Sequence, residues 1–114
     1  MFRQVQDIVG KTELGTSALV VTELLLGVYR GTPEVRLRRR EFIDHMIRGV
    51  LVYPYSLDIA ELAGRLGGQQ AALGQTIPPI DLMIGATALS LGFSLLTTNV
   101  RHFRMIPGLN VIPF

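Results

Sequence analysis

Two stretches of this chain of 114 residues are apolar on nearly every side of a helix, and each contains one acid. The first stretch covers 18–29 and contains Glu23, and the second covers 80–91 and begins beside Asp81. A helix that is apolar all round is expected to be buried. An isolated buried carboxylate is costly unless it is paired, hydrogen-bonded or bound to a cation. The two acids therefore constrain both the fold and the function.

Helical and strand-like segments alternate along the chain, as its hydrophobic spacing indicates. Predicted helices cover 2–9, 18–29, 33–49, 57–74 and 80–91, and predicted strands cover 50–53, 93–97 and the end of the tail at 107–112. Residues 14–17 are interpreted as the end of a strand or a turn. This order is typical of a parallel α/β sheet with helices on both faces. The length allows one domain, which we expect to span 1–114.

Several residues predict where the helices begin and end. Ser17 is an N-cap for the helix over 18–29, and Thr32 followed by Pro33 starts the next helix. Ser56 and Asp58 open the helix over 57–74, and Gly92 provides a left-handed stop after the helix over 80–91.

Composition excludes several classes of protein. The chain has no Cys, which rules out a disulfide scaffold, a thiolate zinc site and a Cys nucleophile. The stretch 82–100 carries no charge, but Gly92 and the polar residues at 97–99 interrupt it, so we interpret it as a buried helix followed by a strand and not as a membrane span. With no signal peptide recognised at 1–10, we expect a cytoplasmic protein.

Arginine dominates the basic residues, and most of the arginines lie between Arg30 and Arg48 around a run of three. The run consists of Arg38, Arg39 and Arg40. One interpretation is a solvated helix face balanced by nearby acids. The alternative is a patch that faces RNA or a protein partner, because arginine binds phosphate and carboxylate groups in bidentate fashion.

Three oxygen-bearing side chains form a candidate metal site. Helix starts that follow strands lie near the carboxyl ends of a parallel sheet, where ligands bind, and we expect Glu23 and Asp81 to stand at two such starts. Asn99 follows the predicted strand over 93–97 and would lie at the same edge. Oxygen ligands of this kind suit Mg²⁺ or Mn²⁺. Alternatively, Asp81 caps its helix, Glu23 pairs with an arginine, and Asn99 only shapes a turn.

Three ordered blocks of this sequence resemble the PIN-domain nucleases, in particular the VapC-type toxins of toxin–antitoxin modules. Residues 20–28 resemble the block T-x-x-E-L-x-x-G, with Val20 where Thr is usual. Residues 80–88 are similar to the helix D-x-x-I-A-A-T-A, and residues 95–109 are similar to the closing block L-V-T-x-N-x-x-x-F-x-x-I-P-G-L.

This resemblance implies a Mg²⁺- or Mn²⁺-dependent endoribonuclease that is inhibited by a cognate antitoxin and works as a homodimer. By position, Glu23 and Asp81 would be metal-binding acids and Asn99 the more variable polar ligand. Thr97 would be the hydroxyl that orients the site, and arginines, Arg101 among them, would steer RNA.

The family usually opens with a buried strand that ends in an Asp, and no such strand is recognised here. Asp7 lies in a helical pattern and is not accepted as its replacement. The resemblance therefore implies an N-terminally truncated domain that binds its ion weakly and has reduced activity. An inactive remnant that still binds an antitoxin or another subunit is the alternative, and a small α/β ligand-binding domain with capping acids is a third possibility.

Overall fold

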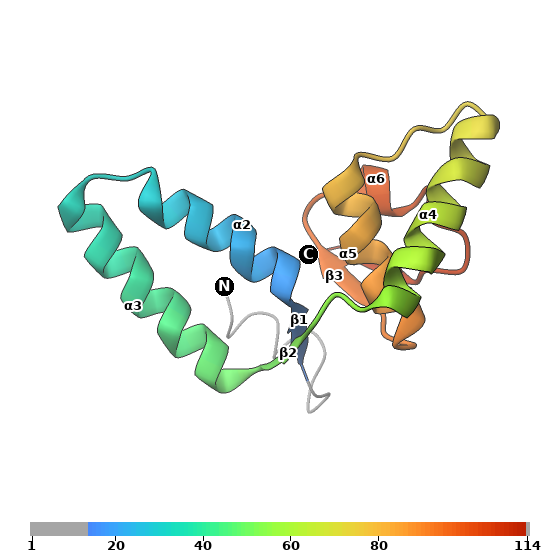
Figure 1. Cartoon of the computed structure of the whole chain (residues 1–114). Helices are drawn as coiled ribbons and strands as arrows, with labels where there is room; N and C mark the ends of the chain where they lie inside the picture. The colour runs from blue at the N-terminus through green and yellow to red at the C-terminus, as the bar shows by residue number, and fades with distance from the viewer. Residues whose placement is uncertain (1–13, 114) are drawn as a thin grey trace. The chain divides into compact units, whose positions relative to one another are not determined.

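The computed structural model describes residues 14–113, which form two compact units, one up to Pro54 and one from Tyr55 onward (Figure 1). The helix predicted over 2–9 and Asp7 lie outside the described residues. The first unit contains β1 (Gly15–Ser17), α2 (Ala18–Tyr29), α3 (Pro33–Gly49) and β2 (Leu51–Tyr53). The second contains α4 (Leu57–Ala72), α5 (Pro79–Ser90), β3 (Leu95–Thr97), α6 (Val100–Phe103) and β4 (Val111–Pro113).

The first unit is a helical hairpin joined to a pair of short parallel strands. β1 pairs with β2 in the register Gly15↔Leu51, and α2 packs against α3. Two arginines of α3 donate to carbonyls at the end of α2 and in the turn that follows it: Arg39 Nη1 to Gly27 O at 3.0 Å, and Arg36 Nε to Gly31 O at 3.0 Å. Positive charge at a helix C-terminus is favourable, so these arginines help to hold the hairpin together.

The second unit has its core between α4 and α5. Ile59 and Ala63 of α4 pack with Ala86 of α5. β3 pairs in parallel with β4, and the connection between them carries α6, because parallel neighbours need a crossover. The buried Gln70 of α4 donates to Met105 O at 2.9 Å, which attaches the segment after α6 to α4.

The predicted fold class, α/β with parallel strands, is confirmed, and the strands within residues 14–113 pair as two two-stranded sheets. Several predicted helix signals are also present. Leu19 N–H donates to Ser17 Oγ at 3.1 Å, and Ile59 N–H donates to Ser56 Oγ at 3.2 Å. Gly92 has φ of 74°, the left-handed conformation predicted for it. Helix α3 begins at Pro33 as predicted, although Thr32 makes no side-chain capping bond.

The expected burial of the two apolar helices is right for α5 and wrong for α2. In α5, the residues at 84–88 are all buried. In α2, Val28 is buried, whereas Leu26 and Tyr29 are exposed. Within its unit α2 packs on one helix and one short strand, which is too little to enclose a helix that is apolar on every side. No helix among residues 14–113 is long and apolar enough to cross a membrane.

Candidate functional site

Asp81 lies in the first turn of α5, and its carboxylate contacts a histidine of α6. Asp81 Oδ2 is 2.7 Å from His102 Nδ1. The side chains of Asp81 and His102 are 21% and 30% exposed, so solvent and small ligands reach both. Within the described part of the chain His102 is the one hydrogen-bond partner of this carboxylate, which leaves Oδ1 free.

Asn99 and Thr97 lie at the carboxyl end of β3, as predicted. Thr97 is the last residue of the strand, and Asn99 is the N-cap residue of α6. The backbone N–H of Asn99 donates to Thr97 Oγ1 at 3.1 Å, so the hydroxyl fixes the turn from strand to helix. The Asn99 side chain is exposed and makes no hydrogen bond within residues 14–113.

The helix that carries Asp81 is connected to the rest of the fold differently from the prediction. We predicted that its helix would follow a strand, which is wrong because α5 follows α4 through the segment 73–78. The capping alternative is also wrong, since α5 has no side-chain cap and the carboxylate bonds His102 instead. The contact between α5 and α6 brings Asp81 to the turn that leaves β3.

Glu23 lies in α2, the helix that directly follows β1. It is exposed, so the expectation of a buried carboxylate is wrong for this residue. The suggested pairing with an arginine is also wrong within the described residues, where the ion pairs join Arg40 to Asp44 and His102 to Asp81. An exposed carboxylate stays hydrated, and its presence in an apolar sequence therefore needs no buried partner.

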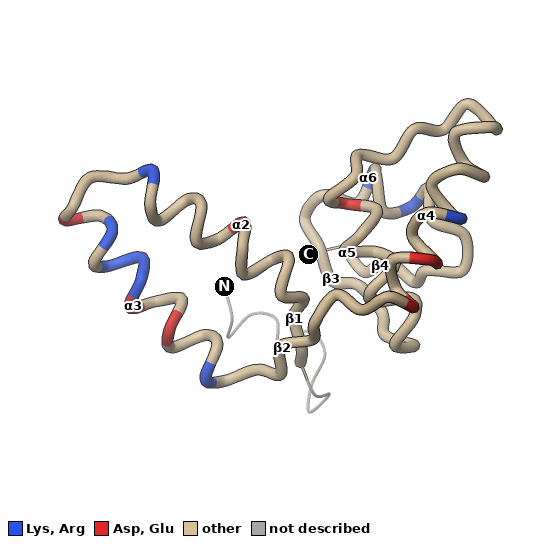
Figure 2. The backbone as a smooth tube through the Cα atoms, in the orientation of Figure 1, with Lys and Arg blue, Asp and Glu red and all other residues tan. Residues whose placement is uncertain are grey.

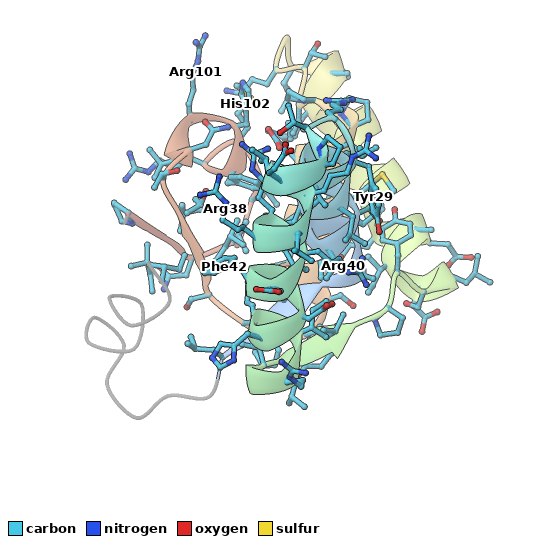
Figure 3. The ribbon with its side chains drawn as sticks, turned by 90° about the vertical axis from the view of Figure 1, so that its left-hand side faces the viewer. Tyr29, Arg38, Arg40, Phe42, Arg101 and His102 are labelled. Atoms are coloured by element: carbon cyan, nitrogen blue, oxygen red, sulfur yellow. The ribbon has the colours of Figure 1, made fainter. Side chains whose placement is uncertain are left out.

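The arginines predicted to steer RNA differ in what they contact. Arg39 donates to the Gly27 carbonyl, and Arg40 Nε lies 3.2 Å from Asp44 Oδ1. Arg38 and Arg101 are exposed and have no hydrogen-bond or ion-pair partner among residues 14–113. Figure 2 shows basic and acidic positions interspersed along α3, and Figure 3 shows Arg38 on the opposite side of that helix from Arg40.

The donors on α5 and α6 fit a hard divalent cation. Asp81 offers a free carboxylate oxygen, and the exposed side chain of Asn99 offers an amide oxygen. Within the described range there is no group of three His, Cys, Asp or Glu side chains arranged to hold a metal ion. The donor chemistry therefore suits Mg²⁺, which keeps several waters and needs few protein ligands, better than a metal that needs a closed cage.

Sequence reasoning missed the contact between His102 and Asp81, and it did not predict α6. The two residues are 21 positions apart. A helix of four residues is too short to show a hydrophobic period. The sequence therefore offered no local signal for this contact.

The sequence profile of the PIN domain matches residues 2–109. The chain belongs to the PIN-domain family. It is 35% identical over 97 residues to ribonuclease VapC1 of Rickettsia felis, covering 84% of this chain and 72% of that protein. It is 39% identical over 97 residues to ribonuclease VapC19 of Mycobacterium tuberculosis, covering 85% and 72%. The predicted resemblance to VapC-type PIN domains is confirmed.

Solved structures confirm the fold. VapBC2 from Rickettsia felis bound to a promoter DNA fragment gives a TM-score of 0.87 at 20% identity, covering 99% of this chain and 84% of that one. DNA-bound VapBC from Salmonella typhimurium gives a TM-score of 0.86 at 24% identity, and the match covers 98% of this chain and 83% of that one. The parallel strands and helices of this chain are thus those of a VapC-type PIN domain.

Proposed function

We propose that this PIN domain is a metal-dependent endoribonuclease toxin of a type II toxin–antitoxin module. The observation that carries the proposal is the similarity to VapC ribonucleases over most of the chain. The free carboxylate oxygen of Asp81 supports it further, because its other oxygen contacts His102 of α6, the helix that follows Asn99. The reaction would be the hydrolysis of RNA phosphodiester bonds.

Each predicted site residue has a separate role in this proposal. Asp81 and Glu23 are metal-binding acids, and Asn99 contributes an amide oxygen. When bound, Mg²⁺ or Mn²⁺ supplies an activated water and neutralises charge that develops on the phosphate. Thr97 acts through its hydroxyl, which accepts the Asn99 N–H and so holds the turn that carries the amide.

The proposed partners are the RNA substrate, a cognate antitoxin and a second copy of the chain, in the cytoplasm. The solved VapBC structures are complexes from related modules, which supports an antitoxin partner. Several apolar side chains of the hairpin are exposed, among them Leu26 and Tyr29 on α2 and Leu37 and Phe42 on α3, and a protein partner would remove such side chains from water.

The experiment that tests the function is cleavage of a single-stranded RNA by the purified chain in Mg²⁺ and in EDTA. We expect internal cleavage in Mg²⁺, none in EDTA, and recovery when excess Mg²⁺ or Mn²⁺ is added back. Cleavage that continues in EDTA would contradict the metal requirement. Absence of cleavage in both ions, with an antitoxin still bound, would favour the inactive remnant.

Of the three consecutive arginines on α3, Arg38 is the one we expect to bind RNA without also stabilising the fold. Replacing Arg38 with Ala should weaken RNA binding several-fold and reduce the salt dependence of the affinity by a slope of about 0.7, the value for one single-strand phosphate contact. Unfolding should be unchanged, because this side chain has no partner within the described residues. Filter binding at several salt concentrations measures the slope.

Arg39 provides the matched control for this prediction. Replacing Arg39 with Ala removes the bond to the Gly27 carbonyl, so we expect a loss of about 0.5–1 kcal/mol in the free energy of unfolding. If Arg38→Ala and Arg39→Ala weaken RNA binding equally and give the same free energy of unfolding, the contacts of α3 do not distinguish an RNA-binding arginine from a structural one.

A further inference from the structure

His102 is a partly exposed histidine that the proposed reaction does not use. Its Nδ1 lies 2.7 Å from Asp81 Oδ2 and joins α6 to the first turn of α5. A carboxylate only accepts hydrogen bonds, so the imidazole Nδ1–H is the donor. A bond of this length to a charged acceptor is strong and fixes the direction of both groups.

The imidazole is itself held in place by its neighbours in the chain. Phe103 is 5% exposed and Ile106 is 2% exposed, so the residues that follow His102 are anchored in the core of the second unit. At the other end of α6, the Asn99 N–H is bound to Thr97 Oγ1. The ring therefore approaches Asp81 from a turn that is fixed on both sides.

The bond has a direct consequence for the Asp81 carboxylate. With Oδ2 occupied by the imidazole, the carboxylate cannot rotate freely, and Oδ1 is the oxygen left for another ligand. A metal-binding carboxylate that is hydrogen-bonded by a second side chain is oriented before the ion arrives, which raises affinity. Without that donor the carboxylate would have to be ordered when the cation binds.

We propose that His102 is a positioning residue, which holds the Asp81 carboxylate through Nδ1–H···Oδ2 so that Oδ1 is presented to a divalent cation. This inference rests on the proposed function, since it takes Asp81 to be a metal-binding acid. It assigns His102 a role through Asp81 and no contact with the RNA.

The test is Mn²⁺ binding by the full chain, followed through the electron paramagnetic resonance signal of free Mn²⁺. His102→Phe keeps a ring but has no donor, and we expect it to weaken Mn²⁺ binding about 10-fold or more. His102→Leu, a second variant without a donor, should behave in the same way. His102→Asn places an amide N–H close to the position of Nδ1, so we expect it to restore most of the affinity.

Two controls separate positioning from a general structural effect. His45→Phe changes the other histidine of the chain, an exposed residue of α3, and should leave Mn²⁺ affinity unchanged. The unfolding midpoints of the His102 variants should stay close to one another, because the imidazole is partly exposed and is not part of the buried core.

Two results would overturn the inference. One is unchanged Mn²⁺ affinity in both His102→Phe and His102→Leu, and the other is equal weakening in these variants and in His102→Asn. Asp81→Asn distinguishes this failure from failure of the proposed site. If Asp81→Asn loses Mn²⁺ binding while His102→Phe keeps it, only the role of His102 is wrong. If Asp81→Asn keeps full affinity, the metal site on Asp81 is wrong as well.

Discussion

Replacing Asp81 with Asn is expected to lower the rate of RNA cleavage by about 100-fold or more. The substitution keeps the size of the side chain and removes the charge that the proposal assigns to holding the cation. A bound metal ion contributes several kcal/mol of stabilisation to the transition state, and each 1.4 kcal/mol corresponds to about a factor of ten in rate. The measurement is the cleavage rate of an end-labelled RNA in Mg²⁺ at saturating enzyme.

Asp58 provides a matched control for this substitution. It lies in the first turn of α4, as Asp81 lies in the first turn of α5, but it is exposed and has no ion-pair partner in the described chain. Asp58→Asn should change the cleavage rate little. Equal rates for Asp58→Asn and Asp81→Asn would contradict the assignment of Asp81 to the metal site.

Replacing Phe103 with Ala should have the largest effect on stability, a loss of about 3–5 kcal/mol in the free energy of unfolding. Phe103 is 5% exposed, and a Cβ built on Gly85 of α5 would lie 3.4 Å from its ring. The ring therefore packs beside Gly85, while Ile106 fills the space that the missing side chain leaves, and both residues fasten the segment of α6 to α5. Urea unfolding, followed by circular dichroism, measures the loss.

The neighbouring Arg104 provides the control for Phe103. It is exposed, and Arg104→Ala should stay within about 0.5 kcal/mol of the unsubstituted chain. Because α6 carries His102 and directly follows Asn99, Phe103→Ala should also weaken Mn²⁺ binding under conditions where the chain is still folded. A loss of stability below about 1 kcal/mol would show that α6 is held by other contacts.

Local signals in the sequence predicted most helix boundaries, because the interactions behind them are local. The hydroxyls of Ser17 and Ser56 cap backbone N–H groups only two and three residues away. Gly92 ends its helix through its own backbone conformation. The burial of α2 was not predictable in this way. An apolar pattern shows which side chains favour burial, but it does not show whether other elements of the fold pack against them.

The candidate site was predictable only in part, for a related reason. Thr97 is the last residue of a strand and Asn99 comes two residues later, so the sequence order itself places them at its carboxyl end. The position of Asp81 depends on the packing of α5 on α6, and its partner His102 is 21 residues away. No local sequence pattern indicates a contact between residues so far apart. The roles of Glu23 and Asp81 as metal-binding acids stay predictions that follow from the family.

The most direct test of the account replaces Asp81 with Cys and compares two metal ions. The chain contains no other Cys, so the new thiolate is the only one present. Thiolates bind soft cations such as Cd²⁺ in preference to Mg²⁺, whereas carboxylates bind Mg²⁺. If Asp81 holds the catalytic cation, Asp81→Cys will be inactive on RNA in Mg²⁺ and will regain cleavage when Cd²⁺ is added. Equal cleavage rates of Asp81→Cys in Mg²⁺ and in Cd²⁺, whether both are high or neither is measurable, would contradict the assignment of Asp81 to the metal site.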